Sequence, residues 1–89
     1  MRIIPSPLKT KKYQAIFNDG KKINFGQKGA SDYTIHHDKE RRQRYLDRHK
    51  VHEDWDNPKT AGALSKWLLW GESISLATNV ANFNRRFGI

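Results

Sequence analysis

The 89-residue sequence predicts an α+β domain in which an N-terminal β-hairpin is followed by three helices. Two observations lead to this class. The N-terminal third alternates apolar and polar residues on either side of the turn sequence Asn18-Asp19-Gly20, which is typical of a hairpin. Further along the chain, apolar residues recur at helical spacing between residues that cap or end helices. Tyr33-Thr34-Ile35 alternates again and is a candidate third strand, so a three-stranded antiparallel sheet stays open.

The hairpin is expected to join strands at residues 12–17 and 21–26. A three-residue loop pairs Phe17 with Lys21, whereas a two-residue loop shifts the pairing by one residue. We prefer the first register because it places every large apolar residue of the hairpin except one on the same face. Gly20 is then expected to adopt a left-handed conformation in a bulge. The side chains expected to face the helices are Tyr13, Phe17, Ile23 and Phe25.

Residues 1–10 are expected to form an extended N-terminal arm, because Pro5 and Pro7 disfavour a helix and remove backbone donors. An extended apolar segment can pair along the exposed sheet edge of a neighbouring chain. The apolar residues of this arm are Ile3, Ile4 and Leu8. The alternative is that the leader folds back onto its own helices. Residues 11–89 are expected to form a single small α+β domain.

Three helices are expected in the rest of the chain. The first spans residues 39–50, with acidic residues at its start and basic residues at its end. The second begins at Asn57-Pro58, where Asn caps and Pro takes the first position, and it ends before Gly71. The third is capped by Ser73 and ended by Gly88. One side of the first helix is expected to hold Arg42, Tyr45, Leu46 and His49. The apolar stripe of the third consists of Leu76, Val80, Phe83 and Phe87.

The net charge of +8 is concentrated near the N-terminus, where residues 1–30 carry seven basic side chains against Asp19 alone. Such a field attracts nucleic acid or an acidic protein surface without choosing between them. The absence of cysteine excludes disulfides and thiolate zinc sites. No apolar run approaches the length of a membrane span, so none is expected.

The histidines are the first candidates for chemistry. Their number would suffice for a zinc site, and His36-His37-Asp38 is similar to the opening of His-Asn-His nucleases. The further Asn and distal His of such nucleases have no counterpart in the expected places. We therefore expect hydrogen-bonded structural histidines, with no metal, no cofactor, no catalytic residue and no enzymatic activity. The four histidines are His36, His37, His49 and His52.

Partner binding is the expected role of the basic and aromatic side chains. Lysines on a hairpin can follow a phosphate backbone or an acidic protein rim, and an arginine cluster adds to them. The helix holding Trp67-Leu68-Leu69-Trp70 is apolar nearly all round, so either a partner or the neighbouring helices cover it. The residues expected to bind partners are Ile3, Ile4, Leu8, Lys9, Lys11, Lys12, Lys21, Lys22, Lys28, Arg41, Arg42, Arg44, Trp67 and Trp70.

The order of motifs along the chain resembles a family of small basic proteins of unknown function from large double-stranded DNA viruses of algae and protists, of the chlorovirus and mimivirus kind. The resemblance covers about residues 9–87. The motifs are Lys11-Lys12-Tyr13, Phe25-Gly26-x-x-Gly29, Asp32-Tyr33-Thr34-x-His36, Tyr45-Leu46-x-Arg48-His49, Thr60-Ala61-Gly62-Ala63-Leu64-Ser65 and Trp67-Leu68-Leu69-Trp70.

This resemblance implies a viral product made in the host cytoplasm and located in the capsid of the virion. The implied function is that of a structural virion component, a minor capsid or capsid-cementing protein that bridges neighbouring viral capsid subunits. The alternative is a basic nucleic-acid-binding protein of viral replication, transcription or packaging.

Overall fold

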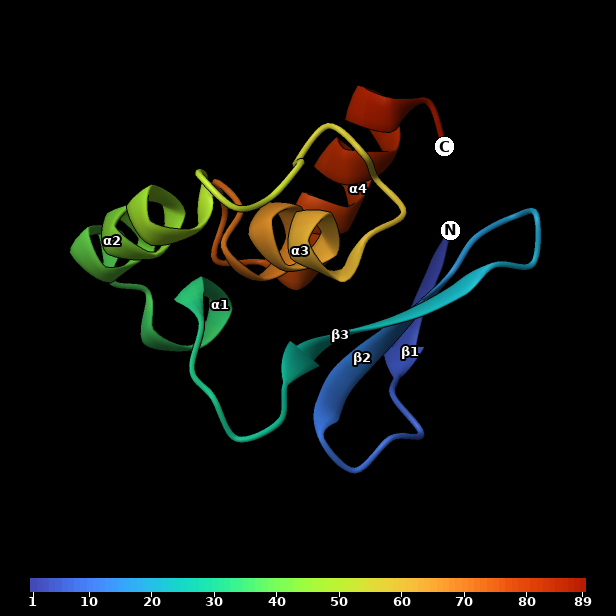
Figure 1. Cartoon of the computed structure of the whole chain (residues 1–89), viewed down its shortest axis with the longest axis horizontal. Coiled ribbons are helices and arrows are strands. Elements are labelled where there is room, and N and C mark those ends of the chain that lie inside the picture. The colour runs from blue at the N-terminus through green and yellow to red at the C-terminus, as the bar shows by residue number, and fades with distance from the viewer.

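The computed structural model describes residues 1–89. A three-stranded antiparallel sheet of order β1-β2-β3 is followed by helices, which confirms the expected α+β class (Figure 1). The strands are β1 (Arg2–Pro5), β2 (Lys11–Ile16) and β3 (Lys22–Gln27). The helical elements are α1 (Tyr33–His36), α2 (Lys39–His49), α3 (Ala61–Leu64), the π-helical turn η1 (Ser65–Leu69) and α4 (Leu76–Phe87). None of these helices has the length and apolarity needed to cross a membrane.

The hairpin of β2 and β3 has the predicted register. Tyr13 lies opposite Phe25, and the Phe17 N–H donates to the Lys21 carbonyl oxygen at 2.9 Å. Gly20 has a φ of 90°, as the three-residue loop requires. The large side chains of one face therefore point toward the helices. The residues that lie in the core or pack against it from this hairpin are Tyr13, Ala15, Phe17, Ile23 and Phe25.

The N-terminal leader is extended, but it is a strand of the domain's own sheet and not an arm. Ile3 lies opposite Ala15, and the Ser6 N–H donates to the Lys12 carbonyl oxygen at 3.1 Å. The Ile3 side chain packs against the core. Pro5 is compatible with this place because proline is tolerated on an edge strand. The expectation that the leader reaches a neighbouring chain is therefore corrected.

The candidate third strand at residues 33–35 is wrong, because this segment forms the single helical turn α1. The Asp32 carboxylate caps the turn by accepting a hydrogen bond from the Thr34 N–H at 2.9 Å. An Asp side chain that satisfies the free donors of a helix start favours a turn over a strand. The strand that completes the sheet is β1 instead.

The three predicted helices are present, and the starts of the second and third are shifted. The first matches α2 to within one residue, and Gly88 ends α4 in a left-handed conformation as expected. Asn57-Pro58 is not a helix start, because Thr60 caps α3. Ser75, not Ser73, caps α4. In each case the cap used is the last hydroxyl residue before the helix. The predicted inward side of α2, with Arg42, Tyr45, Leu46 and His49, holds the partly buried residues of that helix.

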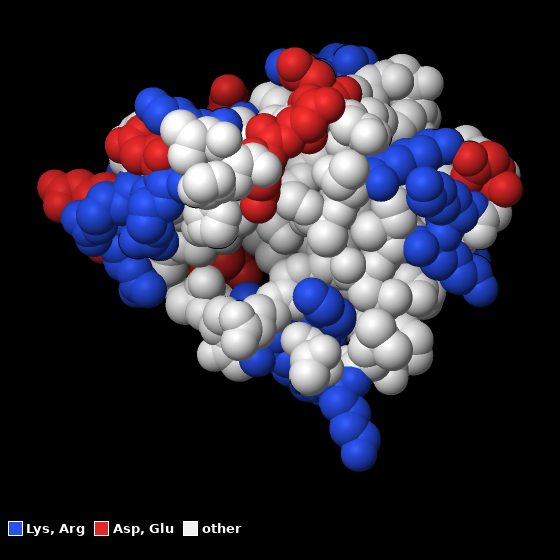
Figure 2. Space-filling model, viewed as in Figure 1, with Lys and Arg blue, Asp and Glu red and all other residues white.

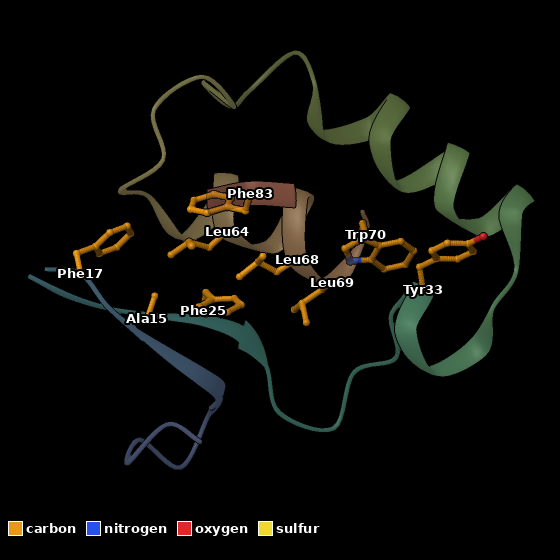
Figure 3. Close-up of a cluster of buried hydrophobic side chains, with 9 residues drawn as sticks. All are labelled: Ala15, Phe17, Phe25, Tyr33, Leu64, Leu68, Leu69, Trp70 and Phe83. Atoms are coloured by element: carbon orange, nitrogen blue, oxygen red, sulfur yellow. The ribbon is translucent and has the colours of Figure 1, made fainter. Parts of the chain in front are cut away.

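A single hydrophobic core lies between the sheet and the helices (Figure 3). Leu64 and Leu68 of the central α3–η1 helix are fully buried between sheet residues on one side and Phe83 of α4 on the other. The π turn places Leu68, Leu69 and Trp70 in the interior in succession. The apolar central helix is thus covered largely by its own chain. The core residues are Ala15, Phe17, Phe25, Tyr33, Leu64, Leu68, Leu69, Trp70 and Phe83.

One buried amide joins α4 to the end of the central helix. Asn79 is 1% exposed, and its Nδ2 donates to the carbonyl oxygens of Leu68 at 3.0 Å and Ser73 at 2.8 Å. Its Oδ1 accepts from the Ser73 N–H at 3.1 Å. The side chain therefore satisfies a buried carbonyl of Leu68 and both backbone groups of the partly buried Ser73 in the bend between η1 and α4.

Replacing Asn79 with Ala is expected to lower the free energy of unfolding by about 3 kcal/mol, because buried backbone groups lose their partners. Urea unfolding measures this loss. Asn82→Ala on the exposed side of α4 is the matched control, with an expected change within about 0.5 kcal/mol. Equal losses in the two variants would contradict the role given to Asn79.

Deleting residues 1–5 is expected to lower the melting temperature by roughly 10 °C, because the sheet loses a strand and the core loses Ile3. Circular dichroism on heating measures the change. Leu8→Ala is the control, since Leu8 is 48% exposed and lies outside the sheet. An unchanged melting temperature after the deletion would return the leader to the role of an arm.

Candidate functional site: a basic cleft beside helix α2

A cleft of about 440 Å³ lies between α2 on one side and the sheet and central helix on the other. Figure 2 shows the surface hollowed between these parts. From α2 come Tyr45, Arg48 and His49, and from the strands Lys11 and Lys12. The loop after β3, the start of the central helix and the side chains of Leu69 and Trp70 complete the lining. The cleft therefore joins segments that are far apart in the sequence.

Three stacked rings form one part of this cleft. Tyr45 and His49 are four residues apart on α2 and share one face of the helix. The Tyr45 ring is parallel to the Trp70 indole, with centroids 4.1 Å apart and an angle of 2°. His49 stacks on Tyr45 at 4.2 Å. The stack fixes α2 against the central helix and holds the imidazole at the cleft.

The Tyr45 hydroxyl keeps its proton at neutral pH. Burial, and to a smaller extent the Glu53 carboxylate, raise the pKa of Tyr45 to about 12. The hydroxyl is therefore a neutral hydrogen-bond donor, and Tyr45 is one of the residues that line the cleft.

The two carboxylates of the cleft both have partners in the chain. Lys12 Nζ donates to Asp32 Oδ2 at 2.6 Å, and this ion pair is largely buried. Glu53 Oε2 accepts from Trp55 Nε1 at 2.8 Å, and its Oε1 lies 3.4 Å from His49 Nδ1. The negative charge of the cleft is thus neutralised or hydrogen-bonded from within.

The remaining polar side chains of the cleft are mostly donors. The half-buried Lys11 and the exposed Arg48 form no ion pair with any Asp or Glu. Ser31 and Ser65 contribute hydroxyls to the lining. The arrangement has a net positive character and can bind an anion.

Several residues expected to bind partners are used by the fold instead. The Arg42 Nε donates to the carbonyl oxygens of Trp70 at 3.0 Å and Gly71 at 2.9 Å. Trp70 is 9% exposed and lies in the core, and Lys12 is held by Asp32. Ile3 of β1 is likewise packed against the core. The expectation of partner contacts is corrected for Ile3, Lys12, Arg42 and Trp70, whereas Ile4 stays a predicted partner residue.

Trp67 is only partly available. Its Nε1 donates to the Trp55 carbonyl oxygen at 2.8 Å. The Lys66 ammonium lies 3.2 Å and the Arg86 guanidinium 4.1 Å from the Trp67 ring centroid, so cations cover the indole. Burial, followed by the nearby Arg42 and Arg86, lowers the pKa of Lys66 to about 8. The other predicted partner residues, Leu8, Lys9, Lys21, Lys22, Lys28, Arg41 and Arg44, are exposed.

The histidines are not gathered into one site. His36 packs 5.3 Å from Trp70 and its Nδ1 accepts from the Asp38 N–H at 2.8 Å. Burial lowers the pKa of His36, so the neutral imidazole is favoured in the folded chain. His37 ends α1 with a φ of 57°, and only His49 lines the cleft. No group of three or more His, Cys, Asp or Glu side chains is placed to hold a metal ion.

A family model described as a family of unknown function (DUF5754) matches residues 1–49, which is more than half of the chain. The chain belongs to this family. No curated protein and no solved structure matches it. The DUF5754 match includes the sheet, α1 and α2, and therefore the Lys12–Asp32 ion pair and the α2 side of the cleft. The central helix on the opposite side lies outside the matched residues.

Three residues that line the cleft were not predicted as site residues from the sequence, namely Arg48, Ser31 and Ser65. The spacing of Tyr45 and His49 indicates one helix face, yet the same spacing is typical of a helix side that simply packs on the core. Arg48 precedes His49 and lies at the edge of that face. Nothing local marks Ser31 or Ser65, because the fold brings them to the cleft from separate loops and helices.

Replacing Lys12 with Met is expected to cost about 3 kcal/mol of stability, because Asp32 is left buried without its cation. Lys11→Met removes the same charge from the neighbouring position, where no ion pair exists, and is expected to cost less than about 1 kcal/mol. Urea unfolding at neutral pH compares the two. A loss of similar size in both variants would contradict the structural role of the Lys12–Asp32 pair.

Proposed function

We propose that this chain is a structural, non-enzymatic virion component, a minor capsid or capsid-cementing protein that bridges neighbouring subunits. The observation that supports it best is the placement of exposed basic side chains in separate patches. The virion context rests on the resemblance of the sequence motifs to small basic proteins of large DNA viruses.

Three patches are defined by residues of different elements. The tip patch is Lys21 and Lys22 at the hairpin turn, and the α2 patch is Arg41 and Arg44. The lower patch is Lys9 and Lys28, which are brought together because the Lys28 N–H donates to the Thr10 carbonyl oxygen at 2.9 Å. The hairpin turn and α2 lie at opposite ends of the longest dimension, which is 36 Å (Figure 1).

Separate patches suit contacts with several neighbours. In Figure 2, basic side chains lie at the left, lower and right borders of the view, with uncharged and acidic surface between them. A nucleic-acid backbone is a continuous line of charge and is usually followed by a continuous basic stripe. A bridging protein needs attachment points on different sides, and charge complementarity then fixes its orientation on each neighbour.

Exposed apolar side chains accompany the basic ones. Leu8 is 48% exposed beside Lys9 of the lower patch, and Val51 is 71% exposed just beyond α2. Phosphates offer nothing for such side chains to bury against, whereas a protein surface does. This pairing supports acidic-rimmed protein surfaces of viral capsid proteins as partners.

The alternative function is nucleic-acid binding in viral replication, transcription or packaging. It is favoured by the net charge of +8 and by the excess of basic residues in the hairpin half of the chain. Its affinity would fall steeply with added salt.

The proposal is tested by quantitative mass spectrometry and imaging of purified particles carrying double variants. Lys21→Gln with Lys22→Gln, and separately Arg41→Gln with Arg44→Gln, are each expected to reduce incorporation several-fold, because each pair removes one attachment point. Lys50→Gln with Arg85→Gln removes the same charge outside the patches and is expected to leave incorporation unchanged.

Absence of the wild-type chain from purified particles would contradict the proposal. So would DNA binding that all three double variants weaken equally, since that result indicates dependence on total charge alone.

A further inference from the structure

We propose that the cleft beside α2 binds the phosphate group of a small phosphorylated molecule, held by Lys11, Arg48 and the Tyr45 hydroxyl. This site is separate from the three surface patches, and its role goes beyond attachment to neighbours. Four features of the cleft support it, namely its charge, its donors, its size and its lining.

The charged side chains of the cleft differ in whether they already have a partner within the chain. Lys12 neutralises Asp32 at 2.6 Å, and Glu53 is engaged by Trp55 and faces His49. Lys11 and Arg48 line the same cleft with no carboxylate within ion-pair distance. An anion bound there meets two cations, Asp32 is neutralised by Lys12, and Glu53 is the one carboxylate of the lining without a lysine or arginine partner.

The donor argument distinguishes a phosphate from a carboxylate. Residues that carry donor groups line both sides of the cleft: Arg48 and Tyr45 on α2, Lys11 on β2, and the two serines Ser31 and Ser65. A tetrahedral phosphate offers oxygens in several directions and an Arg fork can bind it in bidentate fashion. A planar carboxylate offers two oxygens in one plane and would use fewer of these donors.

The size and lining leave room for more than an inorganic ion. The volume of about 440 Å³ lies within the range of small-molecule sites. Leu69 and Trp70 add apolar surface beside the charged groups. A ligand with an uncharged body attached to its phosphate therefore fits the cleft better than the ion alone.

The test uses the full chain in about 0.15 M salt, where weak surface attraction is screened. Inorganic phosphate and adenosine monophosphate are titrated separately and followed by calorimetry and by backbone amide NMR shifts. Saturable binding at one site is expected, with shifts at Ser31, Arg48 and Ser65. Tighter binding of the nucleotide than of phosphate indicates that the body is also bound, whereas equal binding assigns the site to the phosphate group alone.

Lys11→Gln and Arg48→Gln are each expected to weaken binding by about tenfold, the loss of one charge-assisted hydrogen bond. Lys39→Gln removes the same charge from the same helix, outside both the cleft and the surface patches, and is expected to bind as the wild type does. Far-UV circular dichroism checks that each variant is folded.

Four results would overturn the proposal. They are a lack of saturation, an equal loss in Lys39→Gln, acetate binding as tight as phosphate binding, and binding of oligonucleotides alone with a steep salt dependence. None of these results bears on particle incorporation, so failure here is distinguishable from failure of the bridging function.

Discussion

The packing of the central helix between the sheet and α4 is the interaction on which the rest of the structure depends. Leu64 and Leu68 are fully buried between sheet and α4, and Trp70 stacks on Tyr45 of α2. Each outer element therefore reaches its neighbours mainly through this one helix. Two glycines permit the close approach. A Cβ on Gly71 would clash with the Trp67 carbonyl oxygen, and one on Gly26 would lie 2.9 Å from Leu69 Cδ1.

The cleft is a by-product of this arrangement. Arg42 and Tyr45 of α2 contact Trp70 at the end of the central helix. The space left between α2 and the sheet is lined mostly by polar side chains. The same contacts that consume Arg42 and Trp70 as structural residues hold Arg48 and His49 at the opening. One arginine of α2, Arg42, is therefore used by the fold, while another, Arg48, lines the cleft. Because both carry the same charge, the sequence did not distinguish the structural arginine from the one at the site.

Local patterns predicted the parts of the fold that local physics controls. The hairpin register followed from the Asn18–Gly20 turn and from the need to keep large side chains on one face. The position of α2 followed from the acidic residues at its start and the basic residues at its end. The third strand was misplaced because β1 forms by pairing with residues Tyr13–Ile16 of β2, whereas its own sequence, interrupted by Pro5, does not resemble a strand. The cleft could not be predicted for the same reason. Its residues come together only when the central helix packs against the sheet and α2, and no residue spacing in the sequence indicates this.

The order of the strands has a consequence for how the chain acquires its structure. β1, β2 and β3 are neighbours both in sequence and in the sheet, so the meander closes through short-range contacts. The residues that cover its apolar face, from Leu64 to Phe83, come much later. During synthesis the sheet therefore emerges first, with Phe17 and Phe25 uncovered until the central helix arrives. The lysines that flank these rings, and Pro5 on the edge strand, disfavour pairing of this uncovered sheet with the strands of other chains.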